Sequence, residues 1–459
     1  MRNKNETVTL KITDLNNLGC GVGRDTDGVV VFVSGAVTGD TVEAKIIKVN
    51  KSYCVARLER IIEPSVYRIQ TPVCTAPQSC GGCVYRNVTR ECELEMKRSY
   101  VESLFIKAGL ADVKVLPVIT AGERTGYRNK AQYPVRQTKA GIKAGFFANK
   151  THSVVSADKC ALEPDIFADI VKYVCEFAER YGISAYDEQS GRGILRHIYL
   201  RMGNVSGEVM LCLVVNADTL PHSDKLISEI RERFPQITSL MLNINKRNTN
   251  VVTGDKYITL DGNSYIEDTL CGLSFRISPD SFWQVNHDGA ELLYRAARER
   301  AQLDGEQNVL DLYCGTGTIG LSMAKYAKHI TGVEIVGAAV ECAKFNATRN
   351  GIDNADFYCA DASDTESIIP REKKYDVVIL DPPRKGSTPE LIEYIARENI
   401  EKVVYISCGP DTLARDCTLF RKLGYTVGDV QPVDMFPMTG HVESVVCLTR
   451  TLDDKFSLV

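Results

Sequence analysis

Residues 308–320 read NVLDLYCGTGTIG, an apolar run that leads into three glycines, Gly315, Gly317 and Gly320. A buried strand followed by a glycine-rich turn that opens a helix is typical of a ligand-binding βα unit. Glycines let the backbone approach a ligand closely and let the helix pack on the strand. The stretch therefore predicts an α/β fold with a ligand site at the carboxyl edge of its sheet.

The sequence around this stretch, from residue 282 to 459, alternates apolar strands with helical segments. This alternation predicts a doubly wound, mainly parallel sheet of the Rossmann-like type. The last two apolar segments, YTVGDVQPVD (425–434) and HVESVVCLTR (441–450), have no helix between them. We therefore expect the sheet to close with an antiparallel hairpin.

The chain has 459 residues, of which 44% are hydrophobic and 25% charged, with a formal net charge of −4. This composition is typical of a soluble multidomain protein, and any nucleic-acid surface must be local because the whole molecule is not basic. The first residues lack a signal-peptide pattern, and no apolar run is long enough to cross a membrane. We expect a cytoplasmic protein with no membrane association, and no obligate protein partner is evident.

Two further domains are predicted before residue 282. Residues 1–63 contain about five short alternating strands separated by turn residues, which suggests a small barrel of the oligonucleotide-binding (OB) type. The pattern fits a generic β-domain that only stiffens the N-terminal part equally well. Residues 64–281 mix strands and helices as an α+β domain, and we expect a helix near 90–108 that can pack on the C-terminal domain.

Three acidic residues follow successive strands of the C-terminal domain: Glu334, Asp361 and Asp381. Glu334 is placed to accept both hydroxyls of a ribose, and Asp361 lies where an adenine would bind. Asp381 begins the sequence Asp-Pro-Pro-Arg, a rigid turn whose polar groups can face a planar base. A nicotinamide enzyme would share the glycine loop but has no need of this turn. The ligand predicted is therefore S-adenosylmethionine rather than NAD.

Cys408, in ISCGP, follows the fifth strand and lies just before a helix, whose N-terminus favours a thiolate. We take it as the candidate nucleophile. Cys314 is a rival, but its place in the glycine loop suggests packing. Glu443, in GHVE, enters the last strand and is the candidate general base. His441 is its rival, although a histidine at a strand entry is more often structural.

Cys74, Cys80 and Cys83 lie close together in a loop-rich segment, and Cys160 follows far downstream. Closely spaced cysteines in a reducing compartment indicate a metal site. The five-residue gap between the first two fits structural zinc poorly, whereas an iron–sulfur cluster with a remote fourth thiolate fits better.

Two basic runs are candidate RNA contacts. Residues 121–150 hold seven Lys or Arg and one Glu, with Tyr127, Tyr133, Phe146 and Phe147 interleaved. The second run comprises Arg192, Arg196, His197 and Arg201, and either run could equally be a solvated face. Arg384 and Lys385, beside the predicted site, are better placed to hold the backbone of a flipped nucleotide.

In their order and spacing, FWQVN (282–286), DLYCGTGTIG (311–320), DPPR (381–384), ISCGP (406–410) and GHVES (440–444) resemble the RNA (uracil-5-)-methyltransferase family. The resemblance implies Cys408 as nucleophile and Glu443 as proton acceptor on carbon-5 of a uridine. It also implies Gln284, Tyr313, Glu334, Asp361 and Asp381 as contacts to cofactor or target base. Thr318, which stands where some members carry asparagine, is a further cofactor contact that the resemblance implies.

The N-terminal strands resemble the TRAM domain of the ribosomal branch of this family, which favours 23S rRNA as the substrate. The cysteines, Cys160 included, resemble the 4Fe–4S site of that branch. Three alternatives stay open: a tRNA T-loop uridine methyltransferase, an iron–sulfur RNA-binding protein without catalysis, and a nicotinamide oxidoreductase. The intact Cys408 and Glu443 oppose the second, and DPPR with the closing hairpin opposes the third.

Overall fold

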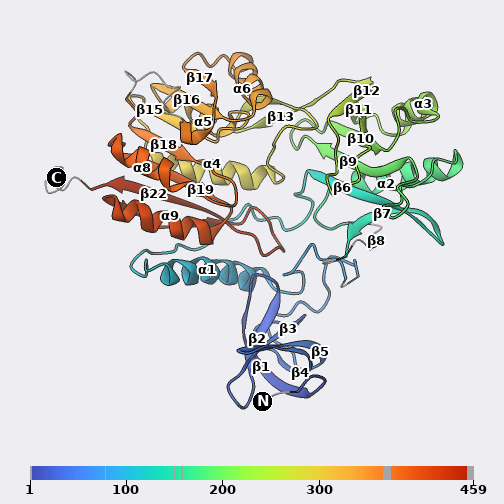
Figure 1. The fold of residues 1–459 in the computed structure, drawn as a ribbon, viewed down its shortest axis with the longest axis horizontal. Coiled ribbons are helices and arrows are strands. Elements are labelled where there is room, and N and C mark those ends of the chain that lie inside the picture. Colours follow the sequence, from blue (N-terminus) through green and yellow to red (C-terminus); the bar gives the residue numbers. More distant parts are fainter. Residues whose placement is uncertain are drawn as a thin grey trace.

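The computed structural model describes residues 3–77, 79–148, 151, 153–156, 159–364 and 374–451. Figure 1 shows a small barrel below, the C-terminal sheet with its helices on one side, and the central sheet on the other. Helix α1 (Arg90–Lys107) lies between the barrel and the C-terminal sheet. None of the helices within the described residues combines the length and apolarity that a membrane-spanning segment requires.

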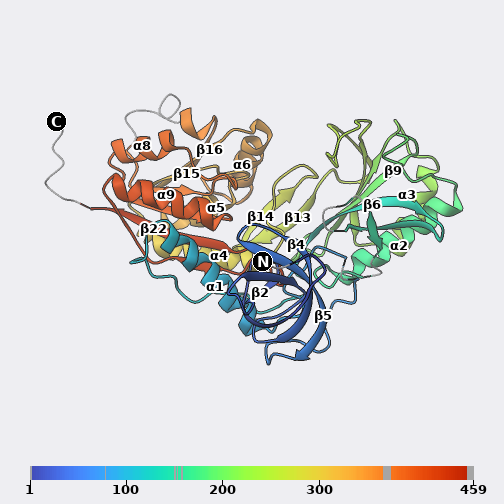
Figure 2. The same cartoon turned by 60° about the horizontal axis from the view of Figure 1, so that its bottom comes forward.

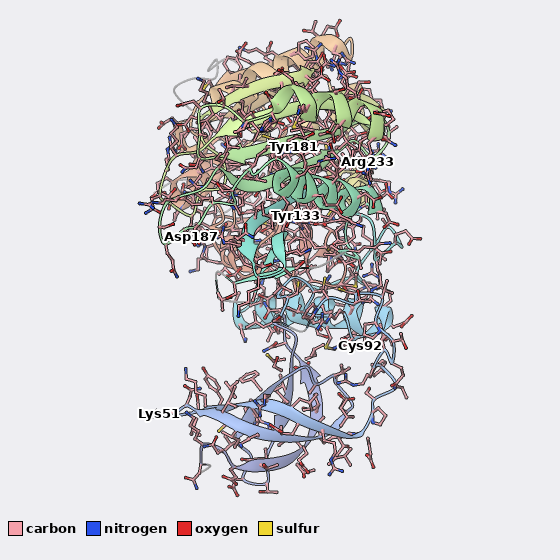
Figure 3. The ribbon with its side chains drawn as sticks, turned by 90° about the vertical axis from the view of Figure 1, so that its right-hand side faces the viewer. Lys51, Cys92, Tyr133, Tyr181, Asp187 and Arg233 are labelled. Atoms are coloured by element: carbon pink, nitrogen blue, oxygen red, sulfur yellow. The ribbon has the colours of Figure 1, made fainter. Side chains whose placement is uncertain are left out.

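The N-terminal part is a closed five-stranded barrel with the order β1-β2-β3-β5-β4, which confirms the predicted small barrel. Alternate residues of its strands point inward and form a separate apolar core that includes Leu10, Ile12, Val31 and Val33. Figure 3 shows the barrel standing away from the rest, with Lys51 at a hairpin tip. The strands are β1 (Thr7–Leu15), β2 (Cys20–Arg24), β3 (Val30–Ser34), β4 (Thr41–Val49) and β5 (Tyr53–Glu63).

Helix α1 belongs structurally to the C-terminal core. Thr89 caps its first turn, and Val101 and Phe105 are buried in the same apolar cluster as Leu310 and Phe420 of the C-terminal sheet and its last helix. Figure 2 shows α1 running along the C-terminal domain on the side of α9 (Pro410–Lys422). The predicted helix near 90–108 therefore packs on the domain that carries the glycine loop, although the strands of the central sheet lie between the two in the chain.

The central part is a seven-stranded mixed sheet with the order β12-β11-β10-β9-β6-β7-β8. Helices α2 (Asp165–Arg180) and α3 (Ser223–Arg233) cover it through a shared apolar cluster. A hairpin, β13 (Ile266–Leu270) with β14 (Leu273–Ile277), links it to the C-terminal sheet. The sheet strands are β6 (Lys130–Thr138), β7 (Gly141–Phe147), β8 (Val154–Ser156), β9 (Leu195–Met202), β10 (Val209–Val215), β11 (Ile237–Ile244) and β12 (Lys256–Gly262).

The C-terminal sheet has eight strands, seven of them in the order β17-β16-β15-β18-β19-β22-β20, with β21 paired to β22. Strands β15 to β19 are parallel and β22 is antiparallel to β19, so the doubly wound sheet and its antiparallel closure are confirmed. The strands are β15 (Asn308–Leu312), β16 (His329–Glu334), β17 (Ala355–Cys359), β18 (Val377–Leu380), β19 (Lys402–Ser407), β20 (Tyr425–Val427), β21 (Gln431–Val433) and β22 (Glu443–Arg450).

Helices flank the C-terminal sheet on both faces, as Figure 1 shows. The segment 425–434, expected as one strand, is divided into β20 and β21 at Gly428, whose N–H donates to the Cys447 carbonyl. The remaining helices among the described residues are α4 (His287–Ala301), α5 (Thr318–Met323), α6 (Gly337–Arg349), α8 (Pro389–Arg397) and the short η1 (Ala324–Tyr326) and η2 (Ala362–Asp364).

Candidate active site

The glycine loop between β15 and α5 is a tight backbone cradle. Gly315 and Gly317 have φ angles of 56° and 81°, in the left-handed region that a side chain disfavours. A Cβ on Gly317 would lie 3.1 Å from the Phe357 ring. Asp311, fully buried, accepts a hydrogen bond of 2.9 Å from the Gly320 N–H and so pins the loop to the start of α5. The loop thus lies as a closely folded backbone segment at the carboxyl edge of the sheet, where such folds bind ligands.

Glu334 and Asp361 lie at the ends of the two strands beside this loop. The Glu334 carboxylate accepts hydrogen bonds from the N–H of Gly315 (3.1 Å) and of Val336 (2.9 Å), so it is oriented toward the glycine loop. Hydrogen bonds from the hydroxyl and N–H of Ser363 lower the pKa of Asp361. Both carboxylates keep acceptor capacity for hydroxyl or amino groups of a nucleoside.

Three predicted contact residues meet around Tyr294, which sequence reasoning did not identify. The Tyr294 hydroxyl shares a 3.0 Å hydrogen bond with Thr318, and Gln284 is a second hydrogen-bonding partner. Tyr294 is almost fully buried, and burial raises the pKa of its hydroxyl, with the charge of Asp381 adding to the rise. In the sequence, Tyr294 looks like one more apolar-face residue of the helix, so no signal distinguished it.

Tyr313 lies on the other side of the loop, between Asp361 and the turn after β18. Its φ angle is 65°, in the left-handed region, and its side chain lies near Ser387. Burial raises the pKa of Tyr313, with the charge of Asp361 adding to the rise. The structure therefore brings the six predicted cofactor contacts to one edge of the sheet: Gln284, Tyr313, Thr318, Glu334, Asp361 and Asp381.

The register of β19 and β22 brings Cys408 and Glu443 together. Ser407 pairs with Ser444, and since the strands are antiparallel, Cys408 and Glu443 follow at the same edge of the sheet. Burial raises the pKa of Glu443 to about 8, with Asp381 adding to the rise and Arg384 opposing it. Glu443 is 6% exposed, whereas Cys408 is only half-buried and Arg384 is exposed. A thiol, a buried carboxyl and a basic side chain thus share one site.

The ionisation of Cys408 differs from the sequence-based expectation. Cys408 immediately precedes Gly409, the N-cap of α9, as predicted. Burial nevertheless raises the pKa of its thiol to about 11, and the carboxyl groups of Glu443 and Asp381 add to the rise. The backbone hydrogen bond at Cys408 lowers the pKa of the thiol, in the direction expected at the start of a helix, but it does not offset these effects. Burial and two acidic neighbours outweigh the helix dipole there.

His441, the rival base, has different neighbours from Glu443. Its ring contacts Phe436 edge to face, and it lines a cavity on the side of the predicted cysteine cluster. Burial lowers the pKa of His441, and Arg384, Lys97 and Arg128 lower it further, so the ring is neutral near pH 7. The structure therefore gives the two candidates different surroundings, with Glu443 beside the thiol and His441 facing the cysteines.

The four predicted metal-ligating cysteines line one cavity of about 600 Å³ between the segment before α1 and the central sheet: Cys74, Cys80, Cys83 and Cys160. Burial raises the pKa of Cys83 to about 12, with the charges of Cys74 and Cys80 adding to the rise. No group of three or more His, Cys, Asp or Glu among the described residues is spaced to hold a single metal ion. A polynuclear cluster needs a wider arrangement of thiolates than one ion does.

Most of the predicted RNA-contacting basic residues in β9 are structural instead. Arg196 is buried and donates to the carbonyls of Asn245 (2.8 Å) and Arg247 (2.7 Å). Arg201 is buried and donates to the Ser278 carbonyl, and burial lowers the pKa of His197 to about 4. Tyr127 and Tyr133 of the first run are also buried. Arg128 and Lys130 line the cysteine cavity, and Arg384 and Lys385 are exposed beside the active site.

The raised pKa of Glu443 predicts how stability depends on pH. A carboxyl whose pKa rises from 4.5 to about 8 on folding contributes stability that is complete below pH 4.5 and is lost as pH rises toward 8. Glu443→Gln removes this titration. We expect the variant to gain stability relative to wild type between pH 5 and pH 8 by on the order of 2–4 kcal/mol. Differential scanning calorimetry at the two pH values measures this gain, and an equal difference at both would contradict the burial of the carboxyl.

Comparisons with known proteins agree with this geometry. Residues 89–451 match the family model of tRNA (uracil-5-)-methyltransferases, and residues 2–58 match that of the TRAM domain. Two relatives named as uncharacterized RNA methyltransferases come from Clostridium tetani and Halalkalibacterium halodurans. The first is 41% identical, covering 98% of each chain, and the second is 40% identical, covering 97% of each.

Among solved structures, the tRNA (uracil-54, C5)-methyltransferase of Pyrococcus abyssi in complex with S-adenosyl-L-homocysteine is similar over almost the whole chain. It is 28% identical, with a TM-score of 0.77, and the match covers 96% of this chain and 99% of the other. The family match excludes the alternative of a nicotinamide oxidoreductase. The chain therefore belongs to the tRNA (uracil-5-)-methyltransferase family of RNA-modifying enzymes and carries a TRAM domain.

Proposed function

We propose that this protein methylates carbon-5 of a uridine in a structured RNA, with Cys408 as nucleophile and Glu443 as general base. The observation that carries the proposal is the register of β19 and β22, which puts the thiol and a buried carboxyl at adjacent strand ends beside the glycine loop. When bound, S-adenosylmethionine supplies an electrophilic methyl group on a sulfonium. The nucleophile and the general base are residues of this chain.

Carbon-5 of uracil is too weak a nucleophile to take a methyl group directly. Addition of the Cys408 thiolate to carbon-6 gives an enolate with negative charge at carbon-5, which can then attack the methyl group. Glu443 accepts the proton that carbon-5 loses, and the electrons of that bond expel the thiolate and restore the ring double bond. Both groups are mostly protonated at neutral pH, so each must first release its proton to solvent: the Cys408 thiol before its sulfur adds to carbon-6, and Glu443 before it accepts the proton from carbon-5.

The residues around the glycine loop fit S-adenosylmethionine. Glu334, already held by two backbone N–H groups, would accept the ribose hydroxyls, and Asp361 with Tyr313 would lie beside the adenine. Gln284, Thr318 and Asp381, which gather around Tyr294, would face the methionine part or the target base. The tight turns at Gly315 and Gly317 leave the backbone free to approach this ligand.

Glu334→Ala tests the cofactor site. Loss of a charged acceptor of two hydroxyl hydrogen bonds should raise the dissociation constant of S-adenosylmethionine by about 10–100-fold, since a hydrogen bond to a charged group contributes about 1.5–3 kcal/mol. Isothermal titration calorimetry measures the constant directly. Glu341→Ala, which removes an exposed carboxylate on the adjacent helix α6, serves as the control and should bind normally. Equal affinities for the two variants would place the nucleoside elsewhere.

Two RNA substrates are candidates. The cysteine arrangement, which resembles that of the ribosomal branch, supports a uridine in 23S rRNA. The Pyrococcus abyssi structure supports the T-loop uridine of tRNA, because its match covers 96% of this chain and so must include barrel residues. The presence of the N-terminal barrel therefore does not favour 23S rRNA over tRNA, although it was expected to do so.

One assay separates these candidates. The protein is incubated with S-adenosylmethionine labelled in its methyl group and with unmodified 23S rRNA or unmodified tRNA, and the RNA is then digested to nucleosides. We expect labelled 5-methyluridine from 23S rRNA. Label in tRNA alone would support the tRNA substrate, and the absence of label from both RNAs would support a binding protein without catalysis.

We also propose that the four cysteines hold a 4Fe–4S cluster. Four thiols that face one cavity, three of them in a single loop, fit thiolate ligation of such a cluster. Bound there, it would cross-link the segment before α1 to the central sheet. The proposed methyl transfer requires no electron from it.

The iron content tests this proposal. Protein purified without oxygen should contain about four iron and four sulfide per chain. Cys83→Ser should lose most of this iron because it removes the thiol beside Cys74 and Cys80. Cys342→Ser, a half-buried cysteine on α6, should keep it. Elemental analysis that finds zinc, or iron unchanged in Cys83→Ser, would contradict the assignment.

A further inference from the structure

The loop that leads into Glu443 has a conformation that its own sequence does not favour. Residues 434–442 join β21 to β22, and Met438 in its middle has a φ angle of 65°, in the left-handed region. This backbone conformation costs free energy in a methionine, so surrounding contacts must stabilise it. The loop's own hydrogen bonds include a 3.1 Å bond from the Thr439 N–H to the Phe436 carbonyl.

The contacts that hold Met438 come from the start of α1 and the segment before it. The Met438 N–H donates to the Glu93 carboxylate at 2.6 Å, and the Met438 carbonyl accepts from the Tyr85 N–H at 2.9 Å. Glu93 is fully buried, so its acceptor faces no competition from water. Both backbone polar groups of the left-handed residue are therefore bonded to a segment more than three hundred residues away in the chain.

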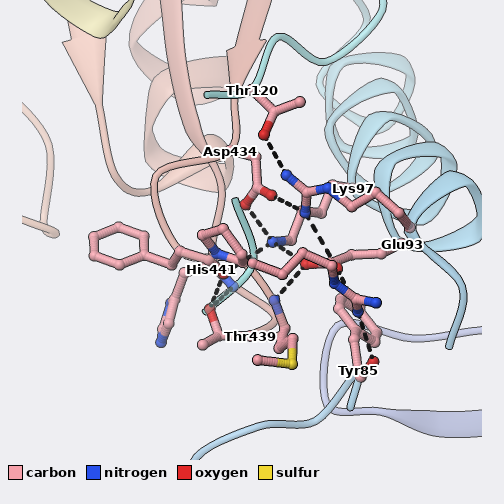
Figure 4. Close-up of polar contacts among 12 residues, drawn as sticks. Tyr85, Glu93, Lys97, Thr120, Asp434, Thr439 and His441 are labelled. Atoms are coloured by element: carbon pink, nitrogen blue, oxygen red, sulfur yellow. Dashed lines mark hydrogen bonds and ion pairs between the residues drawn. The ribbon is translucent and has the colours of Figure 1, made fainter. Parts of the chain in front are cut away.

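A buried lysine joins Glu93 to the first part of the same loop, as Figure 4 shows. Lys97 is 1% exposed, and its ammonium donates to the Glu93 carboxylate (2.9 Å), the Asp434 carboxylate (2.6 Å) and the Phe436 carbonyl (3.0 Å). An ammonium has three hydrogens, so all its donors are used within this network. Arg90 and Arg124 add further ion pairs to Asp434 and Glu93.

The other sides of the loop are also enclosed. The Tyr127 hydroxyl donates to the Pro437 carbonyl (3.0 Å), and the Asn286 amide donates to the Met435 carbonyl (2.9 Å). The barrel reaches the loop as well, because a Cβ on Gly440 would lie 1.8 Å from the Asn17 carbonyl oxygen. The backbone between Met438 and Glu443 therefore has little freedom once Glu93 and Lys97 are in place.

We propose that Glu93 and Lys97 are positioning residues for the general base: they impose the left-handed turn at Met438 and thereby fix where Glu443 meets the target ring. The inference rests on the proposed role of Glu443. It assigns a catalytic consequence to two residues of α1 that touch neither substrate nor cofactor. Their loss should slow proton removal from carbon-5 more than it weakens RNA binding, because the nucleophile lies on a different strand and loop.

The first test replaces Lys97 by methionine, which keeps the length of the side chain and removes its charge. We expect kcat to fall at least tenfold, KM for RNA to change less than threefold, and the methylated protein–RNA adduct to persist on a denaturing gel. Lys107→Met is the matched control, since Lys107 lies exposed in the last turn of the same helix. A Lys97→Met enzyme that folds and releases product at the wild-type rate would overturn the proposal.

The second test separates positioning from stability by using Glu93. Glu93→Gln keeps an oxygen that can accept from the Met438 N–H, whereas Glu93→Ala does not. We expect Glu93→Gln to recover most of the kcat that Glu93→Ala loses, at a temperature where calorimetry shows both to be folded. Equal turnover in the two variants would overturn the proposal even if Lys97→Met fails to fold.

Glu443→Gln is assayed beside these variants, so that the role of Glu443 as general base and the positioning role of Glu93 and Lys97 are tested separately. An adduct that accumulates in Glu443→Gln but not in Lys97→Met or Glu93→Ala contradicts only the positioning role. An adduct that is absent from Glu443→Gln removes Glu443 as the base, and the positioning inference falls with it.

Discussion

Cys408→Ala should abolish methylation of RNA, with a fall in kcat/KM on the order of 10⁴-fold or more. Without the thiol no enolate forms, and carbon-5 of uracil has no other route to a nucleophilic state. Binding of S-adenosylmethionine should stay within about twofold of wild type, because Cys408 follows β19, which β18 separates from the strand β15 that leads into the glycine loop. Transfer of labelled methyl to RNA and calorimetric titration of the cofactor measure the two effects.

Two other cysteines are the controls for this result. Cys359→Ala removes an exposed thiol at the end of β17, on the same edge of the sheet, and should leave turnover unchanged. Cys314 is 4% exposed within the glycine loop, and burial raises the pKa of its thiol well above the ordinary value. If Cys314→Ala abolished the methyl transfer while Cys408→Ala spared it, the nucleophile would be the loop cysteine.

Glu443→Gln should stop the reaction one step later. The thiolate can still add and the methyl group can still be accepted, but glutamine cannot take the proton from carbon-5. We expect turnover to fall by about 10²–10⁴-fold, the range for loss of a general base, and a methylated protein–RNA adduct to accumulate. The adduct should be visible as a slower band on a denaturing gel and should carry label from the cofactor.

Glu393→Gln, an exposed carboxylate on α8, is the matched control and should neither slow turnover nor trap RNA. His441→Gln answers the remaining question about the base. Because the ring of His441 faces the cysteine cavity, we expect that variant to release its RNA. A trapped adduct in His441→Gln together with normal release by Glu443→Gln would show that His441, and not Glu443, is the general base.

Local patterns were sufficient to predict much of this fold. The alternation of apolar strands and helices after residue 282 predicted the doubly wound sheet, and the absence of a helix between the last two segments predicted the antiparallel β22. The short alternating strands before residue 63 predicted the closed barrel. These features depend on period and turn residues, which a single sequence contains.

Sequence motifs predicted residues of the candidate site only where the motif lies at the end of a strand. Cys408, Glu443 and Asp381 interact in the structure because their strands are neighbours at one edge of the sheet. Tyr294 and the Glu93–Lys97–Asp434 network were not predicted, because their partners come from distant segments and no local pattern marks a buried ion pair.

Burial explains two differences between the sequence-based expectations and the structure. Arg196 and Arg201 looked like a basic surface in the sequence, but β9 lies in the middle of a mixed sheet and carries them inward to backbone carbonyls. The helix after Cys408 was expected to stabilise a thiolate, yet Glu443 and Asp381, brought near only by folding, act against it. Charge type can be read from one sequence, whereas the environment of a charge cannot.

The covalent bond between enzyme and RNA is the most direct test of this account. RNA that contains 5-fluorouridine offers no removable proton at carbon-5, so the methylated adduct cannot be resolved and should stay attached to the protein. Digestion and tandem mass spectrometry then locate the attached nucleotide. We expect one modified peptide, with 5-fluoro-5-methyluridine joined through carbon-6 to Cys408. Attachment at another cysteine, or methyl transfer to ordinary RNA without any adduct on the fluorinated one, would contradict the account.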